Sequence, residues 1–177
     1  EDTFMQIEYS IARMSDLDPV IALVRCAIAR MKAQGIRQWD EEIYPRKEDL
    51  FEDISKKEMR IGRIGGRIAV IYVLNTEQEP QYLAAAWQHP QRPYRVLHRL
   101  CVHPDFQNMG LARKTLEHIQ CELIAMGAEV LRLDVFSKSP RALNLYRQAG
   151  FTPTGIITEP IGDFIIMEKY LLKEDAQ

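Results

Sequence analysis

A change of periodicity between residues 95 and 126 constrains the fold more than any other feature of the sequence. RVLHRLCV, at 95–102, has the pattern of a strand, and His103-Pro104 ends it. A helical stripe of apolar residues then follows from Gly110, at Ala112, Leu116, Ile119, Leu123 and Met126. The junction reads QNMGLA, at 107–112, so a glycine and a small residue stand where strand gives way to helix. The chain is therefore expected to pack helices on a sheet.

The remaining segments also alternate between strand and helix patterns. We expect strands at 7–13, 59–64, 67–74, 130–136, 151–158 and 163–172, and helices at 15–35, 45–58 and 140–149. Ser15 is the expected N-cap of the first helix, Pro45 the expected start of the second, and Gly65-Gly66 the expected hairpin turn. Residues 82–88 fit either a strand or a loop. The order predicts an α/β fold with helices on both faces of a mixed sheet, in one domain at 1–177 with its core at about 7–172.

Charge and cysteine content exclude several classes of protein. The formal net charge is -2, and the 23 basic residues are spread along the chain, so we expect no nucleic-acid partner. No apolar run is long enough to cross a membrane, and residues 1–10 do not resemble a signal peptide. Three cysteines without paired spacing favour free thiols. Free thiols suit a reducing compartment, so we expect a soluble, cytoplasmic protein. The four histidines form no set with ligand spacing, so we expect no metal.

The start of the helix at Gly110 has the chemistry of an anion site. The first amides of a helix lack intrahelical acceptors, and the helix dipole adds partial positive charge there. Arg113 and Lys114 add full charges, so a pyrophosphate would suit this position. The six residues alone are equally consistent with a helix that simply begins with a glycine.

Two motifs at a suitable separation resemble those of the GCN5-related N-acetyltransferases (GNAT). Gln107, Gly110 and Ala112 match that family's [Q/R]-x-x-G-x-[G/A] signature. LCVHPDF upstream and SPRALNLYRQAGF downstream resemble its preceding strand and its later short helix. The resemblance extends over most of the chain. It implies a mixed, mostly antiparallel sheet flanked by helices, whose central strands, here those around Leu100 and Leu133, splay apart.

By this resemblance the acyl donor is acetyl-CoA, bound without a metal. Its pyrophosphate would lie on the backbone amides of Asn108, Met109, Gly110, Leu111, Ala112 and Arg113, and Gln107 is a further cofactor-binding candidate. Its pantetheine arm would pair with the backbone of Leu100, Cys101 and Val102. Ser139 stands where the family usually has an asparagine that contacts the pantetheine, so the sequence departs from the pattern there.

The resemblance also suggests catalytic residues for direct transfer to an amine. Tyr146 matches the tyrosine that lies near the coenzyme sulfur in the family, and a phenol can supply a proton at neutral pH. Some family members carry a glutamate where this chain has Val96, whereas Asp134 lies on the next strand, where other members place an acid. Asp134 is therefore the candidate base. His98, His103 or a water molecule could act as the base instead of Asp134. Asp134 could equally have a structural role, in an ion pair with Arg99 or Arg132.

Candidate residues for binding the acceptor amine lie in the connection between the first two expected helices. The connection at 36–45 combines Trp39 and Tyr44 with three acidic residues, which suits a cationic amine but equally fits a solvated acidic loop held by a buried tryptophan. Tyr82, Trp87 and Tyr94 are further candidates for the same cleft. The expected function is acetyl-CoA-dependent N-acetylation of a primary amine, on a small molecule or a peptide. The alternative is a non-catalytic acyl-CoA-binding domain of the same fold. Homodimers are common among similar proteins, and the sequence leaves that partner open.

Overall fold

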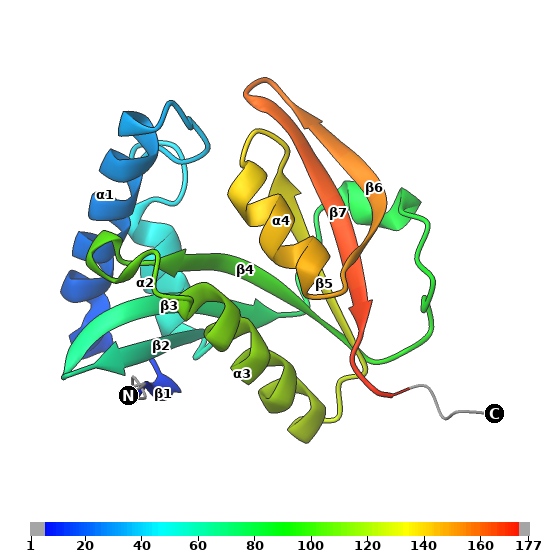
Figure 1. Cartoon of the computed structure of the whole chain (residues 1–177), viewed down its shortest axis with the longest axis horizontal. Coiled ribbons are helices and arrows are strands. Elements are labelled where there is room, and N and C mark those ends of the chain that lie inside the picture. The colour runs from blue at the N-terminus through cyan, green and yellow to red at the C-terminus, as the bar shows by residue number, and fades with distance from the viewer. Residues whose placement is uncertain (1–5, 174–177) are drawn as a thin grey trace. The chain divides into compact units, whose positions relative to one another are not determined.

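The computed structural model describes residues 6–173, and its helices and strands follow the order expected from the sequence (Figure 1). The seven strands have the order β1-β2-β3-β4-β5-β7-β6. Four of the neighbouring pairs, β1/β2, β2/β3, β5/β7 and β6/β7, are antiparallel, and β4/β5 is parallel. The expected mixed, mostly antiparallel sheet is confirmed. The described chain divides into two compact units, one with residues up to Leu74 and His98–Thr115, the other with Asn75–Leu97 and residues from Leu116 onward. The single-domain assignment stays a prediction.

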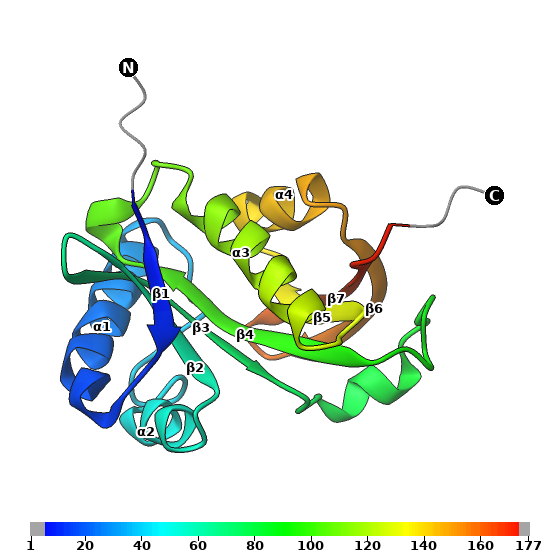
Figure 2. The same ribbon diagram turned by 90° about the horizontal axis from the view of Figure 1, so that it is seen from below.

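The strands of unit 1 run from an edge strand to the carboxyl-terminal half of β4. They are β1 (Glu8–Ile11), β2 (Met59–Ile64), β3 (Arg67–Asn75) and β4 (Tyr94–Val102). β1 lies beside β2, as Figure 2 shows, with Tyr9 opposite Gly62. The turn between β2 and β3 is at Gly65 and Gly66, whose φ angles of +57° and +80° are left-handed. These angles explain why the hairpin was readable from a glycine pair.

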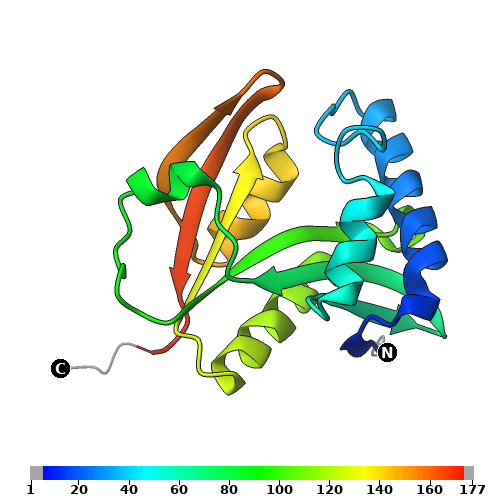
Figure 3. The ribbon, with the colours of Figure 1, turned by 180° about the vertical axis from the view of Figure 1, so that it is seen from behind.

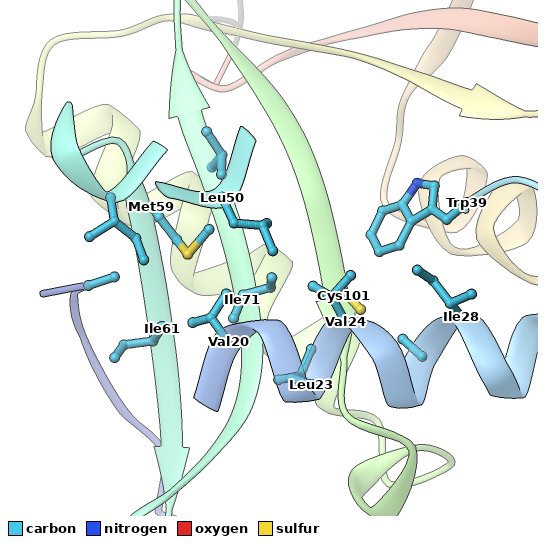
Figure 4. Close-up of a cluster of buried hydrophobic side chains, with 14 residues drawn as sticks. Val20, Leu23, Val24, Ile28, Trp39, Leu50, Met59, Ile61, Ile71 and Cys101 are labelled. Atoms are coloured by element: carbon cyan, nitrogen blue, oxygen red, sulfur yellow. The ribbon is translucent and has the colours of Figure 1, made fainter. Parts of the chain in front are cut away.

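Two helices cover one face of the unit 1 strands. α1 (Leu17–Ala33) and α2 (Lys47–Ser55) turn their apolar stripes toward β2, β3 and β4. Figure 4 shows the resulting cluster, which includes Val20, Leu23, Val24, Ile28, Trp39, Leu50, Met59, Ile61, Ile71 and Cys101. Because successive side chains of a strand point to opposite faces, Leu100 and Val102 lie in a second cluster, away from Cys101.

Both helix starts in unit 1 differ from the expected ones. Ser15 lies inside a short 3-10 turn, Met14–Asp16, and α1 begins at Leu17. The Asp16 carboxylate accepts a hydrogen bond from the Arg13 amide at 2.8 Å. α2 begins at Lys47 rather than Pro45, and Asp49 accepts from the Arg46 amide at 2.7 Å. In both places an aspartate accepts a hydrogen bond from the backbone amide of the residue three positions earlier. This is the bond that the third helical residue makes in a capping box.

Unit 2 contains the amino-terminal half of β4 and the last three strands. Tyr94, Arg95 and Val96 pair in parallel with Val130, Leu131 and Arg132 of β5. β5 (Val130–Phe136), β7 (Gly162–Tyr170) and β6 (Thr152–Glu159) lie side by side, with α4 (Pro140–Gln148) against one face (Figure 3). α3 (Leu111–Ala125) starts in unit 1 and continues into unit 2.

Residues 76–93, which we call the strap, cover the face of the unit 2 strands opposite α4 (Figures 1 and 3). The stretch that fitted either strand or loop is a 3-10 turn at Pro80–Ala84 followed by irregular chain. Tyr82, at 1% exposure, packs in a cluster with Val96, Ile157 and Ile166. The Ala86 amide donates to the Thr154 carbonyl at 2.8 Å, which fixes the strap to β6.

Candidate active site

The turn that follows β4 contains two residues in the left-handed region. Asn108 has φ +62° and Gly110 has φ +72°, and α3 begins at Leu111. Asparagine and glycine are the residues that adopt this region most readily. The Gln107 side-chain amide donates to the Val102 carbonyl at 3.2 Å, so the first residue of the signature holds the turn against the end of β4.

Gly110, immediately before α3, faces open space. The Lys114 amide donates to the Gly110 carbonyl at 3.1 Å, so the amides of the residues before Lys114 precede the first intrahelical bond. A Cβ placed on Gly110 would meet no atom within 4 Å. Leu111, at 2% exposure, anchors this turn in the cluster with Leu100, Val102 and Phe106. Met109 is exposed. A buried anchor beneath an open helix start suits an anion such as pyrophosphate.

Cys101 does not have the properties of a nucleophile. Its side chain is buried against α1, and burial raises the pKa of its thiol to about 12. A thiol that stays protonated near neutral pH is a weak nucleophile. Cys101 is therefore a candidate site residue only through its backbone, like its neighbours Leu100 and Val102 on β4.

Arg99, expected only as an alternative partner for Asp134, is paired with Asp53 within unit 1. It has φ +52° inside β4. Its Nη1 lies 3.3 Å from Oδ2 of Asp53 on α2, and its guanidinium lies 5.1 Å from the centre of the Tyr44 ring. Burial raises the pKa of the Asp53 carboxyl to about 6, although the Arg99 charge opposes that rise. Sequence reasoning missed Asp53, and its place beside Leu50 and Ile54 on the apolar stripe of α2 is the signal that could have found it.

The two aromatic candidates of the acceptor connection have different environments. Trp39 is 7% exposed and packs in the core formed by α1 and α2 (Figure 4), whereas Tyr44 is 41% exposed. Among the three acids, Glu41 pairs with Arg25 at 2.7 Å and Asp40 accepts from the Glu42 amide at 3.0 Å. Trp39 thus has the environment of a structural residue, and Tyr44 remains the aromatic candidate that an acceptor could reach.

Asp134 has a phenol as its partner rather than an arginine. The Tyr82 hydroxyl donates to Asp134 Oδ2 at 2.7 Å. Burial raises the pKa of the Asp134 carboxyl, the Tyr82 hydrogen bond lowers it, and the charge of Glu79 raises it. A carboxyl whose pKa is raised toward neutrality is better suited to accept a proton than an ordinary aspartate.

Arg132, one of the two expected partners of Asp134, is buried in a different arrangement. Its guanidinium lies between the rings of Trp87 and Tyr94, at 4.0 and 4.1 Å from their centres, and its Nη1 donates to Gln78 at 2.9 Å. Trp87 and Tyr94, which we considered as cleft residues, therefore hold an arginine of the sheet.

Ser139 immediately precedes α4, and Tyr146 lies in the last turn of that helix. The Tyr146 ring is buried edge-on against Phe151, 5.5 Å between centres. Burial and, secondarily, the Asp134 charge raise the pKa of the Tyr146 phenol, which therefore keeps its proton at neutral pH. Ser139 precedes α4, its amide donates to the Phe136 carbonyl at 3.0 Å, and its carbonyl accepts from Leu143.

His103, an alternative base, has a structural hydrogen bond in the turn after β4. His103 Nδ1 accepts a hydrogen bond from the Asp105 amide at 3.0 Å, so that nitrogen caps the turn after β4. Across residues 6–173, no three His, Cys, Asp or Glu side chains are grouped so that they could hold a metal ion. Within the same range, no helix is both long and apolar enough to cross a membrane.

The acetyltransferase (GNAT) family model matches residues 33–151, which is most of the chain and includes the turn after β4, β5 and α4. The chain belongs to the GNAT family. This GNAT chain is 40% identical over 61 residues to a ribosomal protein bS18 alanine N-acetyltransferase of Salmonella typhimurium. That match covers 34% of the chain and 41% of the relative, so the chain matches about two fifths of the length of this curated relative.

Solved structures show the same fold over nearly the whole GNAT chain. A GNAT acetyltransferase from Streptococcus agalactiae superimposes with a TM-score of 0.82 at 22% identity, covering 96% of both chains. PaiA N-acetyltransferase from Thermoplasma acidophilum, solved in complex with coenzyme A, gives a TM-score of 0.71 at 19% identity and covers 94% of this chain and 99% of that one. At these identities the likeness shows the fold.

Proposed function

We propose that the chain is an acetyl-CoA-dependent N-acetyltransferase that transfers the acetyl group directly to a primary amine. The observation that carries the proposal is the open turn at Gly110 within a chain of the GNAT family. The turn combines a left-handed glycine, the start of α3 and free space around Gly110, which together fit a pyrophosphate. The coenzyme A complex of the PaiA structural neighbour is consistent with that fit.

The residues that would hold acetyl-CoA are the backbone groups of the signature and of β4. We assign the pyrophosphate to the amides of residues 108–113, with Gln107 holding the turn through Val102. The backbone of residues 100–102 is assigned to the pantetheine arm, and Ser139 is assigned as a hydroxyl that contacts it. When bound, acetyl-CoA supplies the activated acyl thioester.

The acid and base are assigned to residues of unit 2. As the acceptor nitrogen bonds to the acyl carbon and the carbon–sulfur bond breaks, the amine must lose one proton and the thiolate must gain one. We assign removal of the amine proton to Asp134, because its raised pKa favours proton uptake. Delivery of a proton to the thiolate is assigned to Tyr146, whose phenol stays protonated. Direct transfer uses no enzyme nucleophile, which agrees with the buried, protonated thiol of Cys101.

The acceptor is proposed only as a class. Exposed Tyr44 and the neighbouring acids Asp40, Glu41 and Glu42 favour a cationic amine. The name of the Salmonella relative concerns an alanine of ribosomal protein bS18, so peptides with an amino-terminal alanine should lead the panel of acceptors. Polyamines and lysine-containing peptides should follow.

The experiment is a transfer assay with acetyl-CoA across this panel, read by thiol release and by mass spectrometry of the acceptor. We expect at least one acetylated amine, and loss of most of that activity in Asp134→Asn. Acetyl-CoA binding without transfer to any amine would instead favour a non-catalytic acyl-CoA-binding domain.

A further inference from the structure

We propose that Tyr82 is a positioning residue for Asp134, and that the strap at 76–93 holds its hydroxyl on one oxygen of that carboxylate so that the other oxygen is presented for proton transfer. The proposal rests on the proposed role of Asp134 as the base. It adds a residue from a segment, the connection between β3 and β4, to which no catalytic role was assigned.

The Tyr82 hydroxyl forms a hydrogen bond with one oxygen of the Asp134 carboxylate. The Tyr82 hydroxyl lies 2.7 Å from Asp134 Oδ2, across 52 positions of sequence. Burial, the Asp134 charge and this bond itself all raise the pKa of the Tyr82 phenol, so the phenol remains the donor at neutral pH. Among the described residues, no hydrogen bond is donated to Asp134 Oδ1. One oxygen is thus committed to Tyr82, while the other is available.

Hydrogen bonds within the strap and to the sheet hold it in place. The Trp87 indole N–H donates to the Tyr82 carbonyl at 2.9 Å, and the two rings lie 5.5 Å apart. The Gln88 amide donates to the buried carboxylate of Glu168 on β7. Because the strap is bonded to the sheet on both sides of the 3-10 turn, the Tyr82 ring has little freedom to move away from Asp134.

Three further contacts complete this attachment. Gln78 accepts from Arg132 at 2.9 Å and donates to the Tyr94 hydroxyl at 3.0 Å. A Cβ on Gly155 of β6 would approach the Ala85 Cβ to 3.4 Å, so the glycine lets the strap lie close. The strap is therefore attached to the sheet through Gln78, Tyr82 and Ala85, although most of it is irregular and exposed.

Neighbouring groups shift the pKa of the Asp134 carboxyl. The groups that act on the Asp134 charge are the Tyr82 hydroxyl, which stabilises the carboxylate, and Glu79 at the start of the 3-10 turn, which opposes it. The Asp134 charge also contributes, after burial, to the raised pKa of Tyr146 on α4. Removal of the Tyr82 hydroxyl should therefore raise the pKa of Asp134, because the bond that favours the charged form is lost.

The test is Tyr82→Phe, which keeps the ring in its cluster and removes the hydroxyl. The Asp134 carboxyl is titrated by carbon NMR in protein with labelled aspartate, with Asp134→Asn assigning its signal. Tyr94→Phe is the matched control, because it removes a phenol that bonds the strap through Gln78 and does not contact Asp134. We expect the Asp134 midpoint to move upward in Tyr82→Phe and to stay in place in Tyr94→Phe.

Transfer activity gives the second readout. Tyr82→Phe should lower the rate on the acid side of the pH profile by about threefold or more and change the high-pH plateau by less than about twofold. An unchanged Asp134 midpoint would overturn the role of Tyr82 and leave the base assignment intact. A raised midpoint with an unchanged transfer profile would remove Asp134 from the reaction, and Tyr82 with it.

A second variant covers the case in which Tyr82→Phe does not fold. Asp134→Asn keeps an oxygen that can accept from Tyr82 and removes the negative charge. At neutral pH the NMR signal of the Tyr82 ring carbon that bears the hydroxyl should then shift relative to the wild type, because the phenol no longer donates to a charged oxygen. An identical Tyr82 signal in both proteins would contradict the contact.

Discussion

Arg99 and Asp53 form an ion pair in which Nη1 and Oδ2 lie 3.3 Å apart, joining the left-handed residue of β4 to α2. Their side chains are 13% and 8% exposed. Neither Asp53 Oδ2 nor Arg99 Nε has a hydrogen bond in the described structure, so the pair relies on charge more than on directed bonding. It lies beside the backbone that we assign to acetyl-CoA, and it gives a direct test of how β4 is held.

Removal of the arginine should destabilise unit 1. Arg99→Gln leaves the buried Asp53 carboxylate without its compensating charge, and we expect the free energy of unfolding to fall by about 2 kcal/mol at pH above the Asp53 titration. The double variant with Asp53→Asn should recover part of this loss. Denaturant unfolding of the wild type, the two single variants and the double variant measures the interaction free energy between Arg99 and Asp53. If the effects of the two substitutions on the free energy of unfolding were additive, the pair would contribute nothing.

The raised pKa of Asp53 should make the free energy of unfolding depend on pH. Its pKa is raised from 3.8 when unfolded to about 6 when folded, so between these values the folded state binds more protons than the unfolded state. The contribution of Asp53 to the free energy of unfolding is thus most favourable below this window and is lost as pH rises through about 6. Asp53→Asn should flatten this part of the profile in denaturant titrations at successive pH values. An identical slope in wild type and variant would refute the raised pKa.

Gly110 should matter for both conformation and cofactor binding. Gly110→Ala places a Cβ at φ +72° and should lower the free energy of unfolding by about 1 kcal/mol. Gly66→Ala is a matched control, because Gly66 has φ +80° and equally open surroundings. Calorimetric titration with CoA should show a loss of affinity of about tenfold or more for Gly110→Ala, since the added carbon stands where we propose that the pyrophosphate binds, and none for Gly66→Ala. Equal affinities would show that the turn has a structural role alone.

Much of the fold was readable because periodicity and turn chemistry agree along the chain. The stripe from Leu17 to Met31 and the Gly65-Gly66 turn both appear as expected. The two predicted helix starts in unit 1 were wrong by one or two residues. Asp16 and Asp49 each accept a hydrogen bond from the amide three residues earlier, whereas the prediction relied on Ser15 and Pro45.

The site was less accessible to sequence reasoning than the fold. Gln107 and Gly110 follow a local spacing, so they could be predicted as cofactor-binding residues from the sequence alone. Tyr82 and Asp134 meet across 52 positions, and the segment around Tyr82 has neither helical nor strand periodicity. No pattern in one sequence indicates that a phenol in such a segment will reach a particular carboxylate.

Tyr146 should affect turnover rather than binding. Tyr146→Phe keeps the edge-on packing against Phe151 and removes the proton that we assign to the leaving thiolate. We expect kcat to fall by about tenfold or more, with acetyl-CoA affinity unchanged. Steady-state kinetics and calorimetric titration of the same preparation separate the two effects. A kcat equal to that of the wild type would remove Tyr146 from the mechanism.

Calorimetric titration of the purified wild-type chain with acetyl-CoA, beside CoA, tests the central claim most directly. The account predicts saturable binding of both ligands at one site per chain, since both carry the pyrophosphate and pantetheine that the signature and β4 would hold. An absence of binding to either ligand at millimolar concentration would contradict it, because the turn at Gly110 would then be only the start of a helix.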